Sequence, residues 1–492
     1  MRKNLTQIGL QAGIWMGFAR WIVRGAHVVS MSVLAHLLTV EEFGFVAVAK
    51  VLHSLVSMGA FGFSAAVTQK KGQVSQELLN AAWTWDKAVR GCLYSVLLFF
   101  CAPSIARLLG AEEALPIARA MSFLPLAIAL ENNAFVVLSR QLDFRRRFLL
   151  EAANGLSMLL TVCTLAPLLQ SAWAFVAGLF AGLLARAALS YVLHRHVPRF
   201  SWDLRILFEL FGFAKWLFAL NVLQVAREQL AGIVLSNHLG QTSLATFQNG
   251  SRFSNMFASD LTQVARKALF PIYSSVQTDS ARITRGYKKS LQFTLLLTFP
   301  ALGVLAVLAE PLIVLVFSDK WRSSAPVLMW MTLAGALKAI TSSIRPLLIG
   351  RGTPAHEVLL TSIYLVVLIP LIWHTTRSHG VQGAVWAVVL AEGSLVFPWL
   401  WLTTNTLSIT LYETAEIVWT PMLLTLPMCA AAWTATYVCN SELLQLFFGG
   451  TSSLAAGALI IKVADKTNKP ESFQDIKTLV VKMLARNRNR EQ

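Results

Sequence analysis

The chain has 492 residues, of which 55% are hydrophobic and only 14% are charged, and its formal net charge is +17. A soluble protein carries about 25% charged residues, so this composition excludes an ordinary water-soluble domain. Apolar runs of about 20 residues recur almost back to back, which is the helix length that spans the hydrocarbon layer of a bilayer. Because only helices and closed barrels satisfy their backbone groups there, and the runs do not alternate, the sequence predicts an all-α polytopic membrane protein.

The predicted elements are fourteen transmembrane helices joined by short connections. The first apolar run is broken by Arg20 and Arg24 and no small-residue cleavage site follows it, so we expect a retained helix and not a signal peptide. The cysteines lie in or beside apolar runs without metal-ligand spacing, and we expect no metal site. In chain order, the predicted helices cover residues 10–38, 43–67, 88–109, 114–138, 149–170, 172–193, 212–236, 243–270, 288–318, 323–349, 356–376, 381–403, 416–439 and 441–463.

Lysine and arginine residues are distributed unevenly over the connections of this predicted topology. If the N-terminus is cytoplasmic, most of the 42 Lys and Arg residues fall on the cytoplasmic side. Cytoplasmic loops of membrane proteins are enriched in these residues, so we expect both termini in the cytoplasm, membrane lipids against the basic tail and no nucleic-acid partner. The outer connections carry Arg107, Arg119, Lys320, Arg322 and Arg377.

A weak internal repeat predicts how the helices are grouped. When the two segments are aligned, Pro103 corresponds to Pro311 and Pro116 to Pro326. Each repeat has six helices, and because six is an even number, both repeats start on the same side of the membrane and are parallel. Such repeats often hold a substrate cavity at the interface between the lobes. Chance similarity between apolar helices is the alternative. The predicted divisions are an N-terminal lobe at 1–198, a C-terminal lobe at 199–405, two appended helices at 406–464 and a basic cytoplasmic tail at 465–492.

Charged side chains inside the predicted helices indicate the nature of that cavity. A charge in hydrocarbon costs at least about 2.5–3.5 kcal/mol, so such residues usually face a protein interior or water. Five helices carry polar stripes, in which cations outnumber acids, and this predicts a water-filled cationic cavity between the lobes. The alternative is a set of scattered ion pairs between packed helices, or arginines at helix ends that extend to the membrane surface. The predicted substrate-binding residues are Arg20, Arg24, Lys50, Arg227, Asn249, Arg252, Lys338 and Arg345.

A cationic cavity implies an anionic cargo. Arginine pairs bidentately with phosphate, and a phosphorylated headgroup bearing sugars would use more cations than a small drug. The intramembrane acids Glu131, Asp260 and Glu392 are candidates for coupling to a proton or sodium gradient, or alternatively are salt-bridge partners of the arginines. No P-loop pattern is found, and we expect neither a cofactor nor an enzyme activity.

Several segments resemble those of a known family. They are LAHLLTVEEFGFVAVAK, VTQKK, LSRQLDFRRRF, FGFAKWL, ARKALFPIYSSVQTD and FPALGVLAVLAEPLIVLVFSDKWRSSAPVL, and they extend from the first predicted helix to about residue 355. The order of these segments resembles Wzx-type oligosaccharide flippases of the multidrug/oligosaccharidyl-lipid/polysaccharide exporter superfamily, and within them a subgroup like the colanic-acid exporter. His36 departs from the pattern, since the family usually has an arginine there.

This resemblance implies a more specific function. It implies a transporter that flips undecaprenyl-pyrophosphate-linked oligosaccharide repeat units from the cytoplasmic to the periplasmic leaflet of the bacterial inner membrane, for surface polysaccharide synthesis. Alternating access coupled to protons or sodium is implied, as are a polymerase and other export-pathway proteins as partners. The alternatives are a multidrug/cation antiporter of the same superfamily, whose cavity should be acidic, a lipid II-type flippase, and a polymerase or ligase of the same pathway, which should have a large outer loop.

Overall fold

The regular structure of the chain is helical throughout the described residues. The computed structural model describes residues 21–58, 67, 75–133, 136–138, 143–194, 197–274, 280–344 and 355–466. Within these ranges every regular element is a helix and no strand occurs, which confirms the predicted all-α class. Two predicted substrate-binding residues, Arg20 and Arg345, lie outside the described residues.

Long apolar helices confirm that the chain is a polytopic membrane protein. Among the described residues, nine helices are long and apolar enough to cross a membrane, and Trp21–Leu37 forms a shorter apolar helix. Two of the nine spans contain a break, at Gly240 in Phe218–Leu261 and at Gly380 in His356–Leu407, and each corresponds to two predicted helices. The total of fourteen helices remains a prediction.

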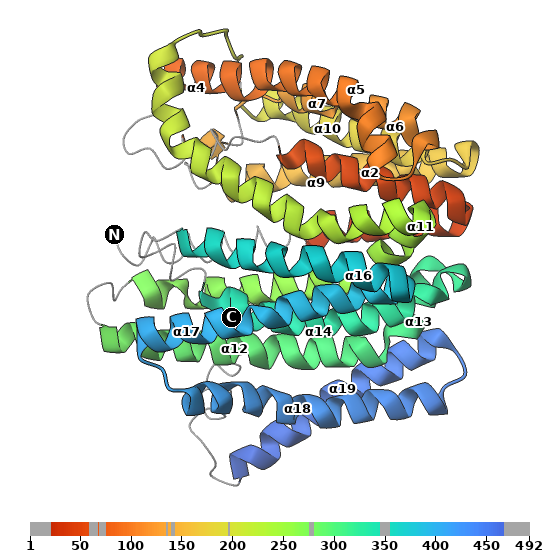
Figure 1. Ribbon diagram of the computed structural model, residues 1–492, viewed down its shortest axis with the longest axis vertical. Coiled ribbons are helices and arrows are strands. Elements are labelled where there is room, and N and C mark those ends of the chain that lie inside the picture. Colours follow the sequence, from red (N-terminus) through yellow and green to blue (C-terminus); the bar gives the residue numbers. More distant parts are fainter. Residues whose placement is uncertain are drawn as a thin grey trace, which may run out of the picture. The chain divides into compact units, whose positions relative to one another are not determined.

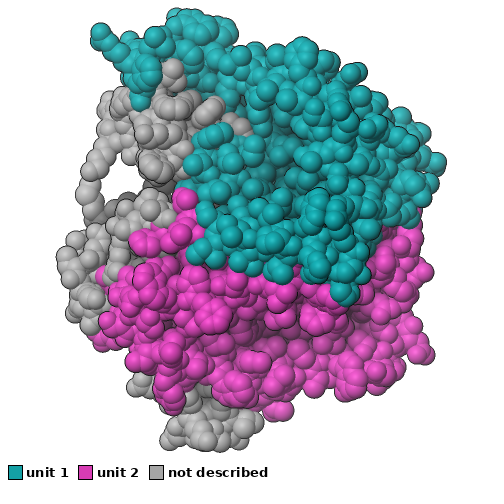
Figure 2. All heavy atoms as spheres, viewed as in Figure 1, with its two compact units in different colours: residues 1–248, 361–384 teal, residues 249–360, 385–492 magenta. Residues whose placement is uncertain are grey.

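The described chain divides into two compact units, each of which is described separately below. The first unit comprises residues 1–248 and 361–384, and the second comprises residues 249–360 and 385–492, as coloured in Figure 2. Two long helices contribute to both units, namely α11, Leu204–Ser274, and α16, Ala355–Ser394. The predicted lobes, 1–198 and 199–405, remain a prediction.

The first unit is built from helices of very unequal length (Figure 1). Besides Trp21–Leu37 and its parts of α11 and α16, it contains α2 (Val40–Met58), α4 (Gln76–Trp83), the π-helix η1 (Thr84–Val89), α5 (Arg90–Leu108), the 3₁₀ helix η2 (Glu112–Ala114), α6 (Leu115–Met121), α7 (Leu124–Ala129), α9 (Phe144–Leu169) and α10 (Trp173–Leu193).

The second unit contains the appended helices and the remaining parts of α11 and α16. Helices α18 (Leu411–Val438) and α19 (Glu442–Lys466) form an antiparallel pair joined by a short turn, and α18 also packs on α12 (Ser280–Val307), as Figure 1 shows. The other elements of the second unit are α13 (Ala309–Phe317), the 3₁₀ helices η3 (Asp319–Ser324) and η4 (Ser342–Ile344), α14 (Ala325–Thr341) and α17 (Val396–Leu407).

The predicted continuous helix over 114–138 is wrong, because the segment is divided into short pieces. Pro116 lies in the first turn of α6, and Pro125 lies in the first turn of α7. Proline lacks a backbone N–H and is tolerated where a helix begins, but it disrupts a helix interior. Each proline therefore opens a new short helix, and the chain beyond Ala129 is irregular up to Asn133.

Small residues let α9 and α10 approach closely in the first unit. Gly178 and Gly182 are four residues apart on α10, and a Cβ atom at Gly182 would lie 2.5 Å from Oδ1 of Asn154 on α9. A Cβ atom at Gly178 would lie 2.7 Å from a methyl carbon of Val162. Lipid-facing helices gain little from the hydrophobic effect, so close packing over small residues drives their association.

The two segments aligned in the sequence repeat have similar local structure. In the first, α5 ends at Leu108, Gly110 has a φ of 58°, and η2 leads into the proline-started α6. In the second, α13 ends at Phe317, Ser318 has a φ of 79°, and η3 leads into α14, which also begins with a proline. The same succession of elements supports the alignment of Pro116 with Pro326.

The outer turn of the second segment contains a buried tryptophan. Tryptophan is common at membrane interfaces, but Trp321 is only 1% exposed. It lies in η3, where the chain folds back before α14, and its indole is buried inside the unit. By contrast, Trp173 and Trp373 are 41% and 49% exposed, as expected for residues at an interface.

Candidate functional site

A buried network surrounds Glu131 in the first unit. One carboxylate oxygen of Glu131 accepts a hydrogen bond of 3.1 Å from Nε of Arg186, and the other lies 3.3 Å from Nζ of Lys87. Arg186 also lies 3.5 Å from Glu151 on α9. The network thus combines two cations with two acids, and its charges compensate one another.

Backbone carbonyls complete the surroundings of the Lys87 ammonium group. Its Nζ donates to the carbonyl oxygens of Glu131 and Asn132, each at 2.9 Å. The Asn132 amide in turn donates to the carbonyls of Ser190 and His194 at 2.9 Å. The pKa of the His194 imidazole is lowered, mainly by burial and to a smaller extent by the positive charge of the nearby Arg146. Since the side chains of Lys87, Glu131 and Asn132 are all hydrogen-bonded, we interpret the network as the element that fixes α10 against the chain after α7.

The network includes two cations that are not among the predicted site residues. Lys87 is close to a polar connection in the sequence, but it lies in the π-helix η1 and is only 8% exposed. Arg186 lies near the end of an apolar run, where an arginine can extend to the membrane surface, but it binds Glu131 and Glu151. The signal available in the sequence was the acid Glu131 in an apolar segment, because a buried carboxylate requires nearby cations.

A second arrangement in the first unit involves Arg227, one of the predicted substrate-binding residues. The guanidinium carbon of Arg227 on α11 lies 4.4 Å from the centroid of the Tyr364 ring on α16. The Tyr364 side chain is 2% exposed, so the ring is held firmly by its surroundings. A desolvated cation–π contact contributes about 2 kcal/mol or more, which offsets much of the cost of an arginine in the membrane.

This contact differs electrically from the network around Glu131. A carboxylate neutralises an arginine, whereas an aromatic ring stabilises the cation and leaves its positive charge in place. The next acid in the sequence, Glu228, accepts a hydrogen bond of 2.5 Å from Gln224 on the same helix.

The other predicted cations of the first unit lie on two further helices. Arg24 is partly buried on the helix Trp21–Leu37, and Lys50 is partly buried on α2. Helix α2 packs on α11, since Gln248 donates to the carbonyl of Ala47 at 3.1 Å and Gly44 contacts Gln241. The structure therefore places these cations on helices of one unit.

The remaining predicted residues that the structure describes lie in the second unit, on two helices. Asn249 and Arg252 follow each other by one turn on α11, and Lys338 lies on α14. These two helices are in contact, because Ser254 donates to the carbonyl of Met331 at 2.5 Å. The Asn249 side chain is fully buried, and neither its oxygen nor its nitrogen has a hydrogen-bond partner in the described structure.

Two acids proposed for ion coupling also lie in the second unit. Asp260 on α11 is 9% exposed and Glu392 on α16 is 4% exposed. The third, Glu131, belongs to the first unit and is engaged by Lys87 and Arg186. No group of three or more His, Cys, Asp or Glu side chains within metal-binding reach occurs among the described residues.

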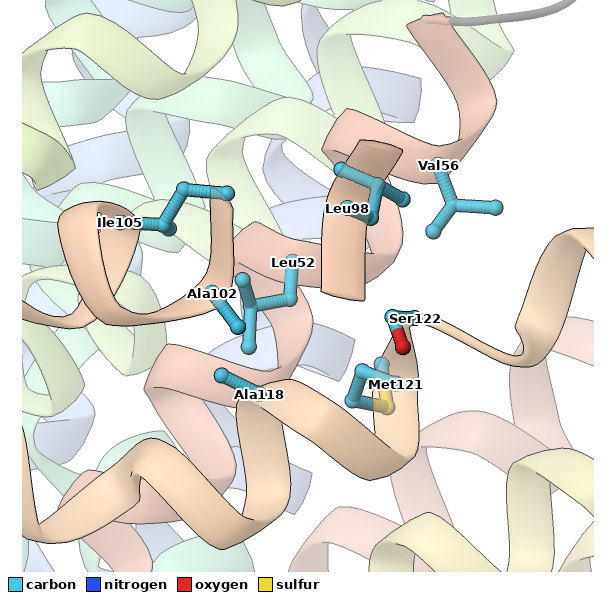
Figure 3. Close-up of a pocket in the computed structure, with 8 residues that line it drawn as sticks. All are labelled: Leu52, Val56, Leu98, Ala102, Ile105, Ala118, Met121 and Ser122. Carbon is cyan, nitrogen blue, oxygen red and sulfur yellow. The ribbon is translucent and has the colours of Figure 1, made fainter. Parts of the chain in front are cut away.

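A recess between α2, α5 and α6 of the first unit is apolar and does not suit a charged ligand. Figure 3 shows its lining, in which the only polar side chain is Ser122, whose hydroxyl donates to the carbonyl of Arg119 at 2.6 Å. We interpret it as a packing hollow. Its lining residues are Leu52, Val56, Leu98, Ala102, Ile105, Ala118, Met121 and Ser122.

Comparison with known proteins identifies relatives of this chain. Residues 33–326 match the family described as "Polysaccharide biosynthesis protein". The succinoglycan biosynthesis transport protein ExoT of Rhizobium meliloti (strain 1021) is 27% identical over 390 residues, which cover 79% of this chain and 76% of ExoT. The lipopolysaccharide biosynthesis protein WzxC of Escherichia coli (strain K12) is 22% identical over 448 residues, or 89% of this chain and 90% of WzxC.

The fold is also similar to that of a solved flippase. The structure of the lipid II flippase MurJ in an inward closed conformation matches with a TM-score of 0.71. The match covers 92% of this chain and 99% of MurJ, at 16% sequence identity. This similarity establishes a polytopic fold of the MurJ type.

Proposed function

The chain belongs to the polysaccharide biosynthesis protein family, and from this premise we propose that it flips undecaprenyl-pyrophosphate-linked oligosaccharide repeat units across the bacterial inner membrane. It is a multi-pass membrane transporter and not an enzyme. The proposed direction is from the cytoplasmic to the periplasmic leaflet. The observation that carries the choice of cargo is the family match over residues 33–326.

The proposed cargo suits the chemistry of the cationic residues. A pyrophosphate group presents several anionic oxygens, and arginine pairs with them through parallel hydrogen bonds. Arg20, Arg24, Lys50, Arg227, Asn249, Arg252, Lys338 and Arg345 are the proposed binding residues. Sugars on the lipid carrier would use hydrogen bonds to uncharged groups, such as the buried amide of Asn249.

Vesicles containing the purified full-length chain test this proposal. We expect transfer between leaflets of a fluorescent oligosaccharide linked to undecaprenyl pyrophosphate, at a rate that protein-free vesicles do not show. Lipid II and a cationic dye, offered in parallel, distinguish the lipid II-type flippase and the multidrug antiporter. Transfer of the dye without transfer of the pyrophosphate lipid would contradict the proposed cargo.

We propose that transport is coupled to a proton or sodium gradient through Glu131, Asp260 or Glu392. An ion that binds Glu131 would have to compete with Lys87 and Arg186, both within 3.3 Å of its carboxylate. Asp260→Asn and Glu392→Gln should each be compared with the unmodified chain at imposed proton and sodium gradients. Unchanged gradient dependence in both variants would remove these two acids from the coupling mechanism.

We propose that both termini lie in the cytoplasm and that the polymerase of the pathway is a partner. The excess of Lys and Arg on one side of the predicted topology supports this orientation. Reporter enzymes fused to each end, one active only in the cytoplasm and one only in the periplasm, give the test. A periplasmic signal from either terminus would reverse the proposed orientation.

A further inference from the structure

The connection between α10 and α11 exposes large apolar side chains from an irregular backbone. Helix α10 ends at Leu193 and α11 begins at Leu204, and residues 197–203 form neither helix nor strand. Within this stretch Phe200 and Trp202 are 65% and 63% exposed. Neighbouring exposed rings of this size indicate a surface that interacts with a partner or with a membrane.

The length of α10 places this connection at the edge of the membrane. The helix contains 21 residues, and at 1.5 Å per residue it is about 31 Å long. The hydrocarbon layer is about 30 Å thick, so the chain has reached its surface where α10 ends. Lipid-exposed irregular backbone is not tolerated inside the hydrocarbon. The connection therefore belongs at the level of the lipid headgroups.

Two hydrogen bonds fix the backbone of the connection to α4 and η1. The backbone N–H of Arg199 donates to Oδ1 of Asn80 at 3.1 Å, and that of Ser201 donates to Oγ1 of Thr84 at 3.0 Å. A backbone donor without a partner is costly away from water. Because side chains of the first unit satisfy these two donors, the connection can lie at the edge of the hydrocarbon at little cost.

The exposed rings rest on two tryptophans of the same unit. The centroids of Phe200 and Trp83 are 5.4 Å apart, and those of Trp202 and Trp85 are 5.5 Å apart, both with the rings edge to face. Phe200 and Trp202 are nearly parallel, with 10° between their planes. Trp83 and Trp85 are partly buried, so they support the two outer rings from within the unit. Aromatic rings, tryptophan above all, are enriched at headgroup level in membrane proteins.

Exposed arginines stand on either side of the two rings. Arg199 precedes Phe200, and Arg205 lies in the first turn of α11. The acid between them, Asp203, accepts the backbone N–H of Arg205 at 2.8 Å and so caps the start of α11. A surface with apolar rings between two cations is complementary to a phospholipid headgroup region of negative charge.

We propose that residues 197–205 form an interfacial anchor that binds anionic phospholipids, with Phe200 and Trp202 among the headgroups and Arg199 and Arg205 on the phosphates. In the predicted topology this is the cytoplasmic leaflet. The proposal goes beyond the proposed function and does not depend on the cargo. Since α11 contributes to both compact units, the anchor holds at the membrane surface the point where the chain enters that shared helix.

A fluorophore attached to Val197→Cys tests the anchor in the full-length chain, after replacement of its five native cysteines. The chain is reconstituted in vesicles of phosphatidylcholine and phosphatidylglycerol, one of which carries bromine as a quencher. Bromine near the headgroup should quench more strongly than bromine near the end of the acyl chain. Brominated phosphatidylglycerol should show about tenfold higher affinity for the site than brominated phosphatidylcholine. In Arg199→Gln/Arg205→Gln this preference should fall to within about twofold of equality, because each arginine contributes to the attraction.

Two controls show whether the preference belongs to this surface. The same fluorophore on Leu168→Cys reports on an exposed position at the opposite end of α9, where no Lys or Arg is near in the sequence, and it should show no preference. The variant Arg107→Gln/Arg119→Gln removes two exposed arginines elsewhere in the first unit and should leave the preference at position 197 unchanged.

Three results would overturn the proposal. Equal quenching by the two brominated lipids at position 197 would exclude an anionic lipid site. A preference that survives Arg199→Gln/Arg205→Gln, or that falls equally in Arg107→Gln/Arg119→Gln, would show that the two flanking arginines are not responsible. Stronger quenching by iodide in the water than by either lipid would place the connection outside the membrane. Transport of the cargo is measured separately, so none of these results affects the proposed function.

Discussion

Arg186 donates a hydrogen bond of 3.1 Å to Glu131, although the two residues are 55 positions apart in the chain. This bond joins α10 to the irregular chain after α7, and Lys87 binds the other oxygen of the same carboxylate. One buried acid therefore binds two cations from different parts of the first unit. Removal of the acid should affect stability before it affects transport.

Glu131→Gln should destabilise the protein by about 3–5 kcal/mol, because it leaves two buried cations without their shared counter-charge. The measurement is the midpoint of thermal unfolding of the purified full-length chain in detergent, monitored by size-exclusion chromatography with fluorescence detection. Glu413→Gln is the matched control, since the Lys288–Glu413 pair is 28% and 40% exposed and such pairs contribute little. A Glu131→Gln variant with the thermal midpoint of the control would contradict a structural role.

Arg24→Ala and Arg252→Ala should each lower polymer export while the amount of protein in the membrane stays constant. A hydrogen bond to a charged group contributes about 1.5–3 kcal/mol, so each loss should reduce transport about tenfold or more. Surface polysaccharide and membrane-inserted protein should be quantified in the same cells. Arg205→Ala, at an exposed position near the start of α11, is the control. Normal export by both variants would remove these residues from the proposed site.

Gly250→Ala should destabilise the second unit, because the close approach of α11 to the start of α14 leaves no room for a methyl group. A Cβ atom there would lie 2.5 Å from Cβ of Val327 and 2.6 Å from the carbonyl oxygen of Ser324. Overpacking of this kind costs about 1–3 kcal/mol. The control is Gly450→Ala in α19, where nothing lies within 4 Å, and where alanine should stabilise the helix slightly. Equal thermal midpoints for the two variants would argue against the close approach.

Ser318→Gly should stabilise the protein by about 1 kcal/mol, because serine here adopts a backbone conformation with a φ of 79° and a ψ of 166° that suits glycine. The substitution also removes a buried hydroxyl oxygen that has no hydrogen-bond partner in the described structure. The reverse change, Gly240→Ala, occurs at a similar φ of 80° and ψ of 173° and should be destabilising. Thermal midpoints in the same detergent decide both, and a lower midpoint for Ser318→Gly would show that the hydroxyl has a role of its own.

The prediction of helices succeeded where a single span of apolar residues dominated the local pattern. Trp173–Leu193 and Leu411–Val438 lie close to the predicted ranges 172–193 and 416–439. The prediction of one helix over 114–138 was wrong, because Pro116 and Pro125 each start a new helix. The chain is apolar on both sides of each proline, so hydropathy did not reveal the breaks. Hydropathy reflects the preference of the side chains for lipid over water. It carries no information about the backbone N–H that proline lacks.

The candidate site was only partly accessible to sequence reasoning. The stripe on α11 identified Arg227 as an intramembrane cation, but nothing in the sequence around it indicated Tyr364, 137 positions away. The same holds for Lys87, whose position beside a polar connection suggested solvent, whereas the continuation of the helical span through η1 buries it. Contacts between distant segments depend on how helices pack.

By itself the sequence determined that this protein lies in a membrane and that its fold is all-α. The free energy of transferring a helix into lipid is a sum over the residues of that helix, and it does not depend on contacts with other helices. It also supplied a surplus of cations within the membrane spans. Only the tertiary structure decided which groups surround each cation, such as Glu131 beside Arg186 and the Tyr364 ring beside Arg227. The reason is that the electrostatic energy of a buried charge depends on the few groups within several ångströms of it, and those groups come from different helices.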